Sequence, residues 1–202
     1  MNTPQKIYTV AITGASGAIY GVRLTKELLK NHCKVHLLIS EAGWQVFREE
    51  LRLDTSNRSA CLEQLFGEGN QEHLHTHSLR DFTAPIASGS YKNDGMIIIP
   101  CSMGTLSKIA NGNSGNLLER TADVMLKEGR RLTIVPRETP LHQIHLENMT
   151  ALSKAGAHII PAMPGFYHLP ASLDDLVNFV VGKVLDNLGV EHTLFTRWGE
   201  QQ

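Results

Sequence analysis

Short apolar runs rich in β-branched residues recur along this 202-residue chain and alternate with longer stretches whose apolar positions have a helical period. The first pattern predicts buried strands, and the second predicts amphipathic helices. We expect strands at residues 7–13, 34–40, 95–100, 132–136 and 157–161. We expect helices at residues 17–30, 42–51, 116–129, 140–155 and 172–188. This alternation indicates an α/β fold, a three-layer, Rossmann-like (flavodoxin-like), doubly wound and mostly parallel sheet.

Terminal residues predict the boundaries of two helices. Thr139 followed by Pro140 predicts an N-cap and a first helical residue, and the stretch from Ser172 to Gly189 runs from a cap to a stop signal. Residues 54–93 are the least regular part of the chain, because glycine and proline interrupt them repeatedly.

Composition and charge limit the classes of function. With 42% hydrophobic and 19% charged residues, the chain can bury one sizeable core, and we expect a single domain over residues 1–202. A formal charge of -1 without any Lys/Arg block argues against nucleic acid or an anionic membrane as the main partner. No apolar run approaches the ~20 residues of a membrane span, and the amino-terminal MNTPQK contains no apolar signal segment.

Neither the cysteines nor the histidines predict a metal site. Cys33, Cys61 and Cys101 are odd in number and lack CxxC spacing, which also argues against a disulfide framework and favours a reducing, cytoplasmic location. Two groups of histidines have spacings that occur in metal sites: His73, His75 and His77, whose alternation is also that of a solvated or partly paired β-strand, and His142 and His145. Because no carboxylate or cysteine accompanies them at ligand spacing, we assign no metal.

The segment TGASGAIYG, residues 13–21, predicts a phosphate-binding turn between the first strand and the first helix. Gly14, Ala15 and Ser16 offer close backbone approach, N–H donors and a hydroxyl at the positive end of a helix dipole. Ser40 ends the next strand where an acidic residue would hold an adenosine ribose, so a mononucleotide such as FMN is favoured over a dinucleotide. Tight helix–strand packing without a ligand is the alternative interpretation.

Polar residues follow other predicted strands as well. Ser102, Met103, Gly104 and Thr105 open a helix after a buried strand and repeat the anion-binding pattern, although simple helix capping would explain them too. The pair Arg137 and Glu138 follows another strand and is either functional or a structural ion pair. Ligands of open α/β sheets bind at the carboxyl ends of the strands, so these residues together predict a site.

Two cations on one predicted helix suit an anionic leaving group. Arg120 and Lys127 are seven residues apart, which places them on one face roughly 10 Å from each other. A solvated helix face is the simpler interpretation unless a ligand or another subunit covers them. Further candidates are Tyr167 in a rigid loop, Lys183 beside an apolar stripe, Glu50 at a helix end, and the tail with Phe195 and Trp198.

Several motifs together resemble the UbiX-type flavin prenyltransferases. They are GASGAIYG, ASGS at residues 87–90, PCSMGTLS, NLLERTADVMLKE, VPRETPLHQIHLENM, PAMPGFYH and the closing RWGE. The resemblance runs from about residue 7 to residue 199 in the same order and spacing. It implies a Rossmann-like homo-oligomer, a dodecamer in that family, whose tail docks on a neighbouring subunit.

The resemblance also implies an activity. A dimethylallyl group passes from dimethylallyl phosphate to N5 and C6 of reduced FMN without a metal, and the prenylated FMN serves a UbiD-type decarboxylase, as in ubiquinone biosynthesis. The implied flavin-binding residues are Gly14, Ala15, Ser16, Ser40, Ser102, Met103, Gly104, Thr105 and Arg137. The implied allylic-phosphate residues are Ser88, Arg120, Lys127, Tyr167 and Lys183, the last being often arginine in that family. The residues implied at the reacting centre are Ser16, Glu50, Lys127, Glu138 and Trp198.

Other interpretations remain open or are disfavoured by missing motifs. A flavin-dependent cysteine decarboxylase would carry PASANT-like and PxMNxxMW-like runs, which are absent. A short-chain NAD(P)-dependent reductase would carry a YxxxK pair, which is also absent. A non-catalytic FMN carrier would share the flavin-binding residues and stays open.

Overall fold

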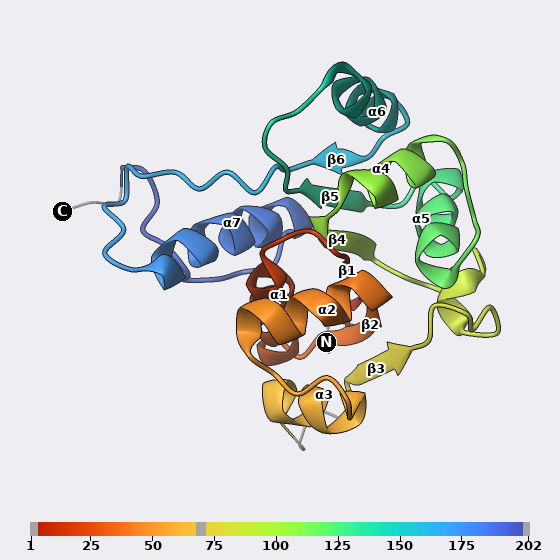
Figure 1. Cartoon of the computed structure of the whole chain (residues 1–202), viewed down its shortest axis with the longest axis horizontal. Helices are drawn as coiled ribbons and strands as arrows, with labels where there is room; N and C mark the ends of the chain where they lie inside the picture. The colour runs from red at the N-terminus through yellow and green to blue at the C-terminus, as the bar shows by residue number, and fades with distance from the viewer. Residues whose placement is uncertain (1–3, 68–71, 200–202) are drawn as a thin grey trace.

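One parallel sheet organises the computed structural model, which describes residues 4–67 and 72–199 (Figure 1). Residues 1–3 of the amino-terminal segment and Glu200 of the RWGE motif lie outside the described residues. The strands are β1 (Ile7–Ile12), β2 (Lys34–Ile39), β3 (Leu74–His77), β4 (Gly95–Cys101), β5 (Leu132–Pro136) and β6 (His158–Ile159). They lie in the order β3-β2-β1-β4-β5-β6, and each neighbouring pair is parallel.

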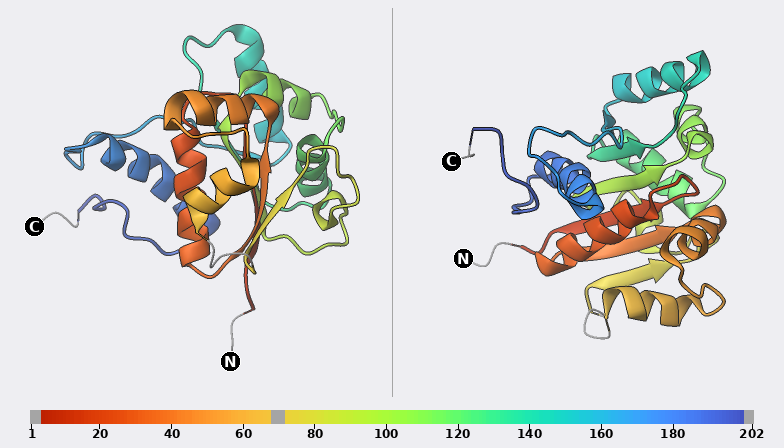
Figure 2. Two further views of the ribbon diagram at one scale, coloured as in Figure 1. Left: turned by 60° about the horizontal axis from the view of Figure 1, so that its bottom comes forward. Right: turned by 60° about the vertical axis from the view of Figure 1, so that its left-hand side comes forward.

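Helices cover both faces of the sheet and make the predicted three layers (Figure 2). The helices are α1 (Ala18–Lys30), α2 (Glu41–Leu51), α3 (Arg58–Phe66), the short 3-10 helix η2 (Pro85–Ala87), α4 (Met103–Ala110), α5 (Leu117–Lys127), α6 (Gln143–Lys154) and α7 (Leu173–Leu188). Apolar residues of α1, α2, α3 and α7 form one core with one face of the strands. Apolar residues of α4, α5 and α6 form the other.

The order of the strands reverses between β1 and β4, which lie side by side although β2 and β3 separate them in sequence. The chain leaves β1 toward β2 on one side and later leaves β4 toward β5 on the other. The loops after β1 and β4 therefore diverge at the carboxyl edge of the sheet, and in open α/β folds this point, the crevice, is where ligands bind. No helix among residues 4–67 and 72–199 is long and apolar enough to cross a membrane.

The structure confirms the predicted strands and most of the helices, with two corrections. Residues 54–93 contain α3 and η2, which the broken periodicity did not predict, and β3, where the alternating histidines indicated a strand. The helix predicted to begin at Thr139 and Pro140 instead begins at Gln143. The Thr139 hydroxyl donates to the Glu138 carbonyl at 2.8 Å instead of accepting from a helical amide, so it does not cap α6.

The histidines beside β2 form a hydrogen-bonded cluster. His36 is 2% exposed, and its Nδ1 lies 2.7 Å from Nε2 of His77 while its Nε2 lies 2.8 Å from the Tyr91 hydroxyl. Within the described residues, no group of three or more metal-ligating side chains is arranged to hold an ion. Burial, followed by the charges of His77 and Lys34, lowers the pKa of His36 to about 3.

Stability is expected to fall as the pH drops below the ordinary histidine pKa of about 6.5. The unfolded chain binds a proton at His36 more readily than the folded chain does, so this contribution is complete above that pKa and is lost as the pH falls toward 3. Urea unfolding at several pH values checks this, and His36→Gln should flatten the dependence. The exposed His142→Gln is the control and should leave it unchanged. If the stability of His36→Gln falls with decreasing pH as steeply as that of the wild type, His36 is not the source of the pH dependence.

Candidate functional site

A single threonine joins the two predicted anion-binding turns at the crevice. Thr13 is 1% exposed, and its Oγ1 donates to the Pro100 carbonyl at 2.8 Å. The same oxygen accepts from the Ser102 amide at 2.8 Å. The end of β1 is thereby fixed to the start of α4 across 89 residues of sequence. Thr13 begins the predicted phosphate-binding segment but was not predicted as a site residue, although a hydroxyl at the end of a buried strand is a signal that could have identified it.

Removing this hydroxyl is expected to destabilise the protein and weaken ligand binding at the crevice together. Thr13→Val keeps the shape of the side chain but leaves the buried Ser102 amide without its acceptor, which costs about 1–3 kcal/mol. Thermal unfolding and FMN titration measure the two effects, and Thr13→Ser is the control because it keeps the hydroxyl. Unchanged stability in Thr13→Val would show that the bond contributes nothing.

The first turn partly differs from the prediction, because a carboxylate already occupies two of its amides. Glu50, at the end of α2, accepts from Gly17 N at 2.8 Å and from Ala18 N at 3.2 Å. Gly17 has a φ of 101°, which favours glycine, and begins α1 without a side-chain cap. Glu50 thus stabilises the positive end of α1, and the donors left for an anion are at Gly14, Ala15 and the exposed Ser16.

Two predicted serines cap helices at the same edge. The Ser40 hydroxyl accepts from Gly43 N at 2.9 Å and caps α2. The Ser102 hydroxyl accepts from Thr105 N at 3.3 Å and donates to the Thr105 hydroxyl at 3.1 Å. Capping was the simpler interpretation of Ser102, and the structure confirms it. It also places the amino-terminal ends of α2 and α4 at the carboxyl edge of the sheet.

Two groups at the carboxyl edge of the sheet are open to a ligand: Arg137 Nε and the start of α4. The Arg137 amide donates to the Cys101 carbonyl at 3.3 Å, and Arg137 Nε is buried without a hydrogen-bond acceptor among the described residues. Burial raises the pKa of Tyr20, and the charge of Arg137 acts against that rise. No atom lies within 4 Å of a Cβ built on Gly104, so the start of α4 is open to a ligand.

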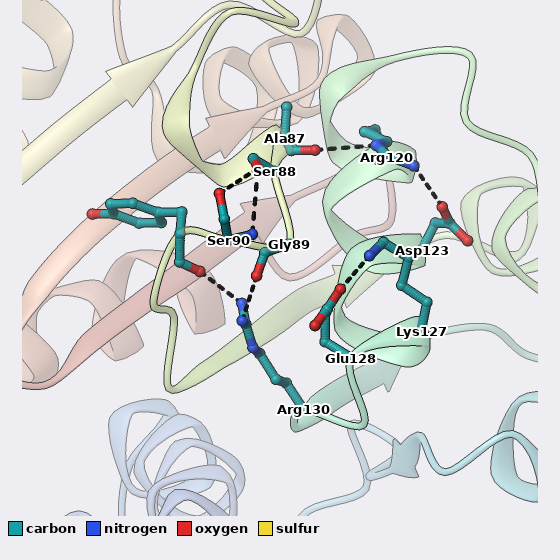
Figure 3. Close-up of polar contacts among 10 residues, drawn as sticks. Ala87, Ser88, Gly89, Ser90, Arg120, Asp123, Lys127, Glu128 and Arg130 are labelled. Carbon is teal, nitrogen blue, oxygen red and sulfur yellow. Dashed lines mark hydrogen bonds and ion pairs between the residues drawn. The ribbon is translucent and has the colours of Figure 1, made fainter.

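The ASGS segment, which carries Ser88, lies against the side chains of Arg120 and Lys127 of α5 (Figure 3). Arg120 Nε donates to the carbonyl of Ala87 at 3.1 Å, directly before Ser88. A Cβ built on Gly89 would lie 2.7 Å from Lys127 Nζ. Lys127 also pairs with Glu128, and this contact lowers the pKa of the Glu128 carboxyl. The predicted cations therefore face the ASGS segment, not open water alone.

Tyr167 and Trp198 also lie together. Their rings meet edge to face at 5.4 Å, and Tyr167 makes a second edge contact with Phe179 of α7 at 5.6 Å. Phe195 packs against Phe179 of the same chain, while Trp198 is 78% exposed. The tail therefore folds back on its own α7, and docking on a neighbouring subunit stays a prediction for Trp198.

Two predicted site residues make only local contacts. Lys183 lies 3.8 Å from Asp186 on the same helix. Asp186 also accepts from Arg197 of the tail at 2.7 Å, and the Arg197 guanidinium lowers the pKa of the Asp186 carboxyl. Glu138 is exposed and accepts from the amide of the next residue at 3.0 Å.

A separate cavity of about 580 Å³ lies at the carboxyl ends of β2 and β3. It is lined by residues of α2 and α3 and by the segments around residues 78–80 and 115–116. Arg58 and Glu41 make a two-point ion pair at 2.9 and 2.5 Å across its wall, and Arg80 lines it as well. None of the predicted site residues lines this cavity.

Comparisons with known proteins agree on one family. The family model described as Flavoprotein matches residues 1–185. The flavin prenyltransferase UbiX of Alkalihalophilus pseudofirmus is 70% identical over 97% of this chain and 98% of its own length. The structure of AnUbiX (PadA1) in complex with FMN and dimethylallyl pyrophosphate has a TM-score of 0.87 and 38% identity, covering 98% of this chain and 100% of that one.

Another similar solved structure is described as a dodecamer. The dodecameric FMN-dependent Ubix-like decarboxylase of Escherichia coli O157:H7 has a TM-score of 0.84 and 44% identity. The alignment covers 95% of this chain and 98% of that one.

Proposed function

The chain belongs to the UbiX flavin prenyltransferases, and we propose on that premise that it transfers a dimethylallyl group from dimethylallyl phosphate to N5 and C6 of reduced FMN. The observation that carries this proposal is the position of the ASGS segment, with Ser88, against Arg120 and Lys127 of α5. Cations and a hydroxyl at one point suit a departing phosphate, because they stabilise the charge that develops as the allylic C–O bond breaks.

The crevice between β1 and β4 would hold FMN. The flavin-binding residues in this proposal are Gly14, Ala15, Ser16, Ser40, Ser102, Met103, Gly104, Thr105 and Arg137. The unpartnered Nε of Arg137 and the open start of α4 support the assignment. When bound and reduced, FMN supplies the electron-rich acceptor atoms.

The remaining residues act on the phosphate, the allylic group and the protons. Arg120, Lys127, Tyr167 and Lys183 hold the departing oxygens in this proposal. The aromatic faces of Tyr167 and Trp198 exclude water and tolerate a nearby allylic cation. Ser16, Glu50 and Glu138 are the candidates to hold the protons released at the acceptor atoms.

Anaerobic incubation with reduced FMN and dimethylallyl phosphate tests the activity. Mass analysis should find the flavin heavier by one dimethylallyl group, with inorganic phosphate released in equal amount. An unmodified flavin that stays bound would identify a non-catalytic FMN carrier. Turnover of a cysteine-containing peptide or pantetheine derivative with release of CO₂ would identify the decarboxylase alternative.

The proposal includes a homo-oligomer of the dodecameric kind described for the E. coli protein. Exposed apolar side chains support it, because a solvated surface rarely carries so many near one edge: Met163, Phe166, Leu169, Leu173 and Trp198. Light scattering during gel filtration is expected to find an assembly larger than a dimer. Leu169→Asp should reduce its size, and a wild-type monomer with full prenylation activity would contradict the prediction.

We also propose a cytoplasmic location and a functional link to a UbiD-type decarboxylase that consumes prenylated FMN. The three cysteines support the first part, because all are buried free thiols, as a reducing compartment favours. A decarboxylation assay with an FMN-free UbiD-type enzyme tests the second part. The product of this chain should activate that enzyme, and unmodified FMN should not.

A further inference from the structure

Arginine side chains donate hydrogen bonds to every second carbonyl of the segment 87–91, which carries Ser88 (Figure 3). Arg120 donates to the Ala87 carbonyl at 3.1 Å. Arg130 donates through one terminal nitrogen to the Gly89 carbonyl at 2.5 Å and through the other to the Tyr91 carbonyl at 2.7 Å. Hydrogen bonds from a charged donor are among the stronger ones in proteins, so this fork fixes the segment more firmly than a neutral contact would.

The end of α5 explains why Arg130 points at this segment. Gly129 has a φ of 62°, its amide donates to the Leu126 carbonyl at 3.1 Å, and the Arg130 amide donates to the Met125 carbonyl at 2.8 Å. This pair of bonds is a Schellman motif, which ends the helix in a defined backbone conformation. The backbone of Arg130 is therefore fixed relative to α5, the helix that carries Arg120 and Lys127.

A second anchor holds the far end of the segment. The Tyr91 hydroxyl lies 2.8 Å from Nε2 of the buried His36 on β2. The segment is thus fixed to α5 on one side and to the sheet on the other. Its middle lies beside the side-chain ends of α5, because a Cβ built on Gly89 would meet Glu128 Oε1 and would lie 2.7 Å from Lys127 Nζ.

We propose that Arg130 is a positioning residue for the phosphate subsite. Its two hydrogen bonds to Gly89 and Tyr91 set the distance of Ser88 from Arg120 and Lys127, and its own guanidinium does not contact the substrate. The inference rests on the proposed function, because it takes Ser88, Arg120 and Lys127 as the residues that hold the allylic phosphate.

Binding without turnover tests the inference directly. Protein loaded with oxidised FMN is titrated with dimethylallyl phosphate by calorimetry. Arg130→Ala should raise the dissociation constant by about tenfold, because a displaced Ser88 no longer meets the phosphate together with the two cations. Arg130→Lys should recover only a minor part of the loss, since an ammonium supplies the charge but not the fork. FMN affinity should stay within about twofold of the wild type, which a general loss of folding would not allow.

The neighbouring arginine provides the matched control. Arg131 is exposed and makes no side-chain hydrogen bond to residues 87–91, so Arg131→Ala removes the same charge without removing the fork. If Arg131→Ala raises the dissociation constant equally, or if Arg130→Lys restores the wild-type value, long-range charge explains the effect and the inference is overturned. Unchanged binding in Arg130→Ala would overturn it too.

Two further variants, Tyr91→Phe and Lys127→Ala, test the second anchor and the phosphate site separately. If Arg130→Ala does not fold, Tyr91→Phe tests the second anchor and should raise the same dissociation constant by a smaller factor, whereas unchanged binding in Tyr91→Phe would overturn the inference. Lys127→Ala separates this inference from the proposed function. If Lys127→Ala binds dimethylallyl phosphate as tightly as the wild type, the phosphate site itself is misplaced. If only Lys127→Ala loses affinity, the proposed function stands and the role of Arg130 fails.

Discussion

Lys127→Ala is expected to slow prenyl transfer by at least about tenfold, equivalent to roughly 1.4 kcal/mol of lost transition-state stabilisation. The ammonium lies against the Ser88–Gly89 backbone, where the departing phosphate would sit. FMN affinity should hardly change, and folding should be little affected because the side chain is largely exposed. Single-turnover absorbance of the flavin under anaerobic conditions measures the rate.

Arg120→Ala should behave similarly, and the double variant should lose less than the product of the two effects, because two cations acting on one phosphate are not independent. Lys26→Ala, on the exposed face of α1, is the control for the removal of a positive charge. Wild-type rates in both Lys127→Ala and Arg120→Ala would show that the phosphate binds elsewhere.

Phe47→Ala should lower the free energy of unfolding by about 3–5 kcal/mol. Phe47 is fully buried in α2, and its ring packs against Trp44 with centroids 5.4 Å apart. The expected damage extends to the site, because α2 carries Ser40 at its start and Glu50 at its end. FMN affinity should therefore fall with stability, which urea unfolding and flavin titration measure separately.

The control for Phe47 lies on the same helix. Gln45 is exposed, so Gln45→Ala should change the free energy of unfolding by less than about 0.5 kcal/mol. A loss under about 1 kcal/mol in Phe47→Ala would mean that the core around α2 collapses into the space left by the ring.

The fold was predictable wherever apolar periodicity is strong. Strands such as β4 are buried along their whole length and appear in the sequence as unbroken apolar runs. β3 was indicated only by the alternation of its histidines, because it is short, lies at the edge of the sheet and has no buried apolar run. α3 was not predicted because its apolar residues do not gather on one face.

The site was predictable only where its residues are neighbours in sequence. The turns at Gly14 and Ser102 are visible because each is a compact motif between a strand and a helix. The contacts that tie the site together join distant residues: Glu50 lies 33 positions from Gly17, and Arg130 lies 39 positions from Tyr91. Composition and spacing carry no information on such distances, because packing of the layers alone brings these residues together.

The three buried cysteines report local unfolding of the regions around them, because a thiol reacts only when it becomes exposed. Burial raises the pKa of Cys33, Cys61 and Cys101, so each stays protonated and sheltered until its surroundings unfold. They lie in three different places, before β2, within α3 and at the end of β4 beside the crevice. Alkylation rates therefore measure the opening of three regions separately. A molecule seated in the crevice should protect Cys101 from the reagent while Cys61 reacts at its usual pace.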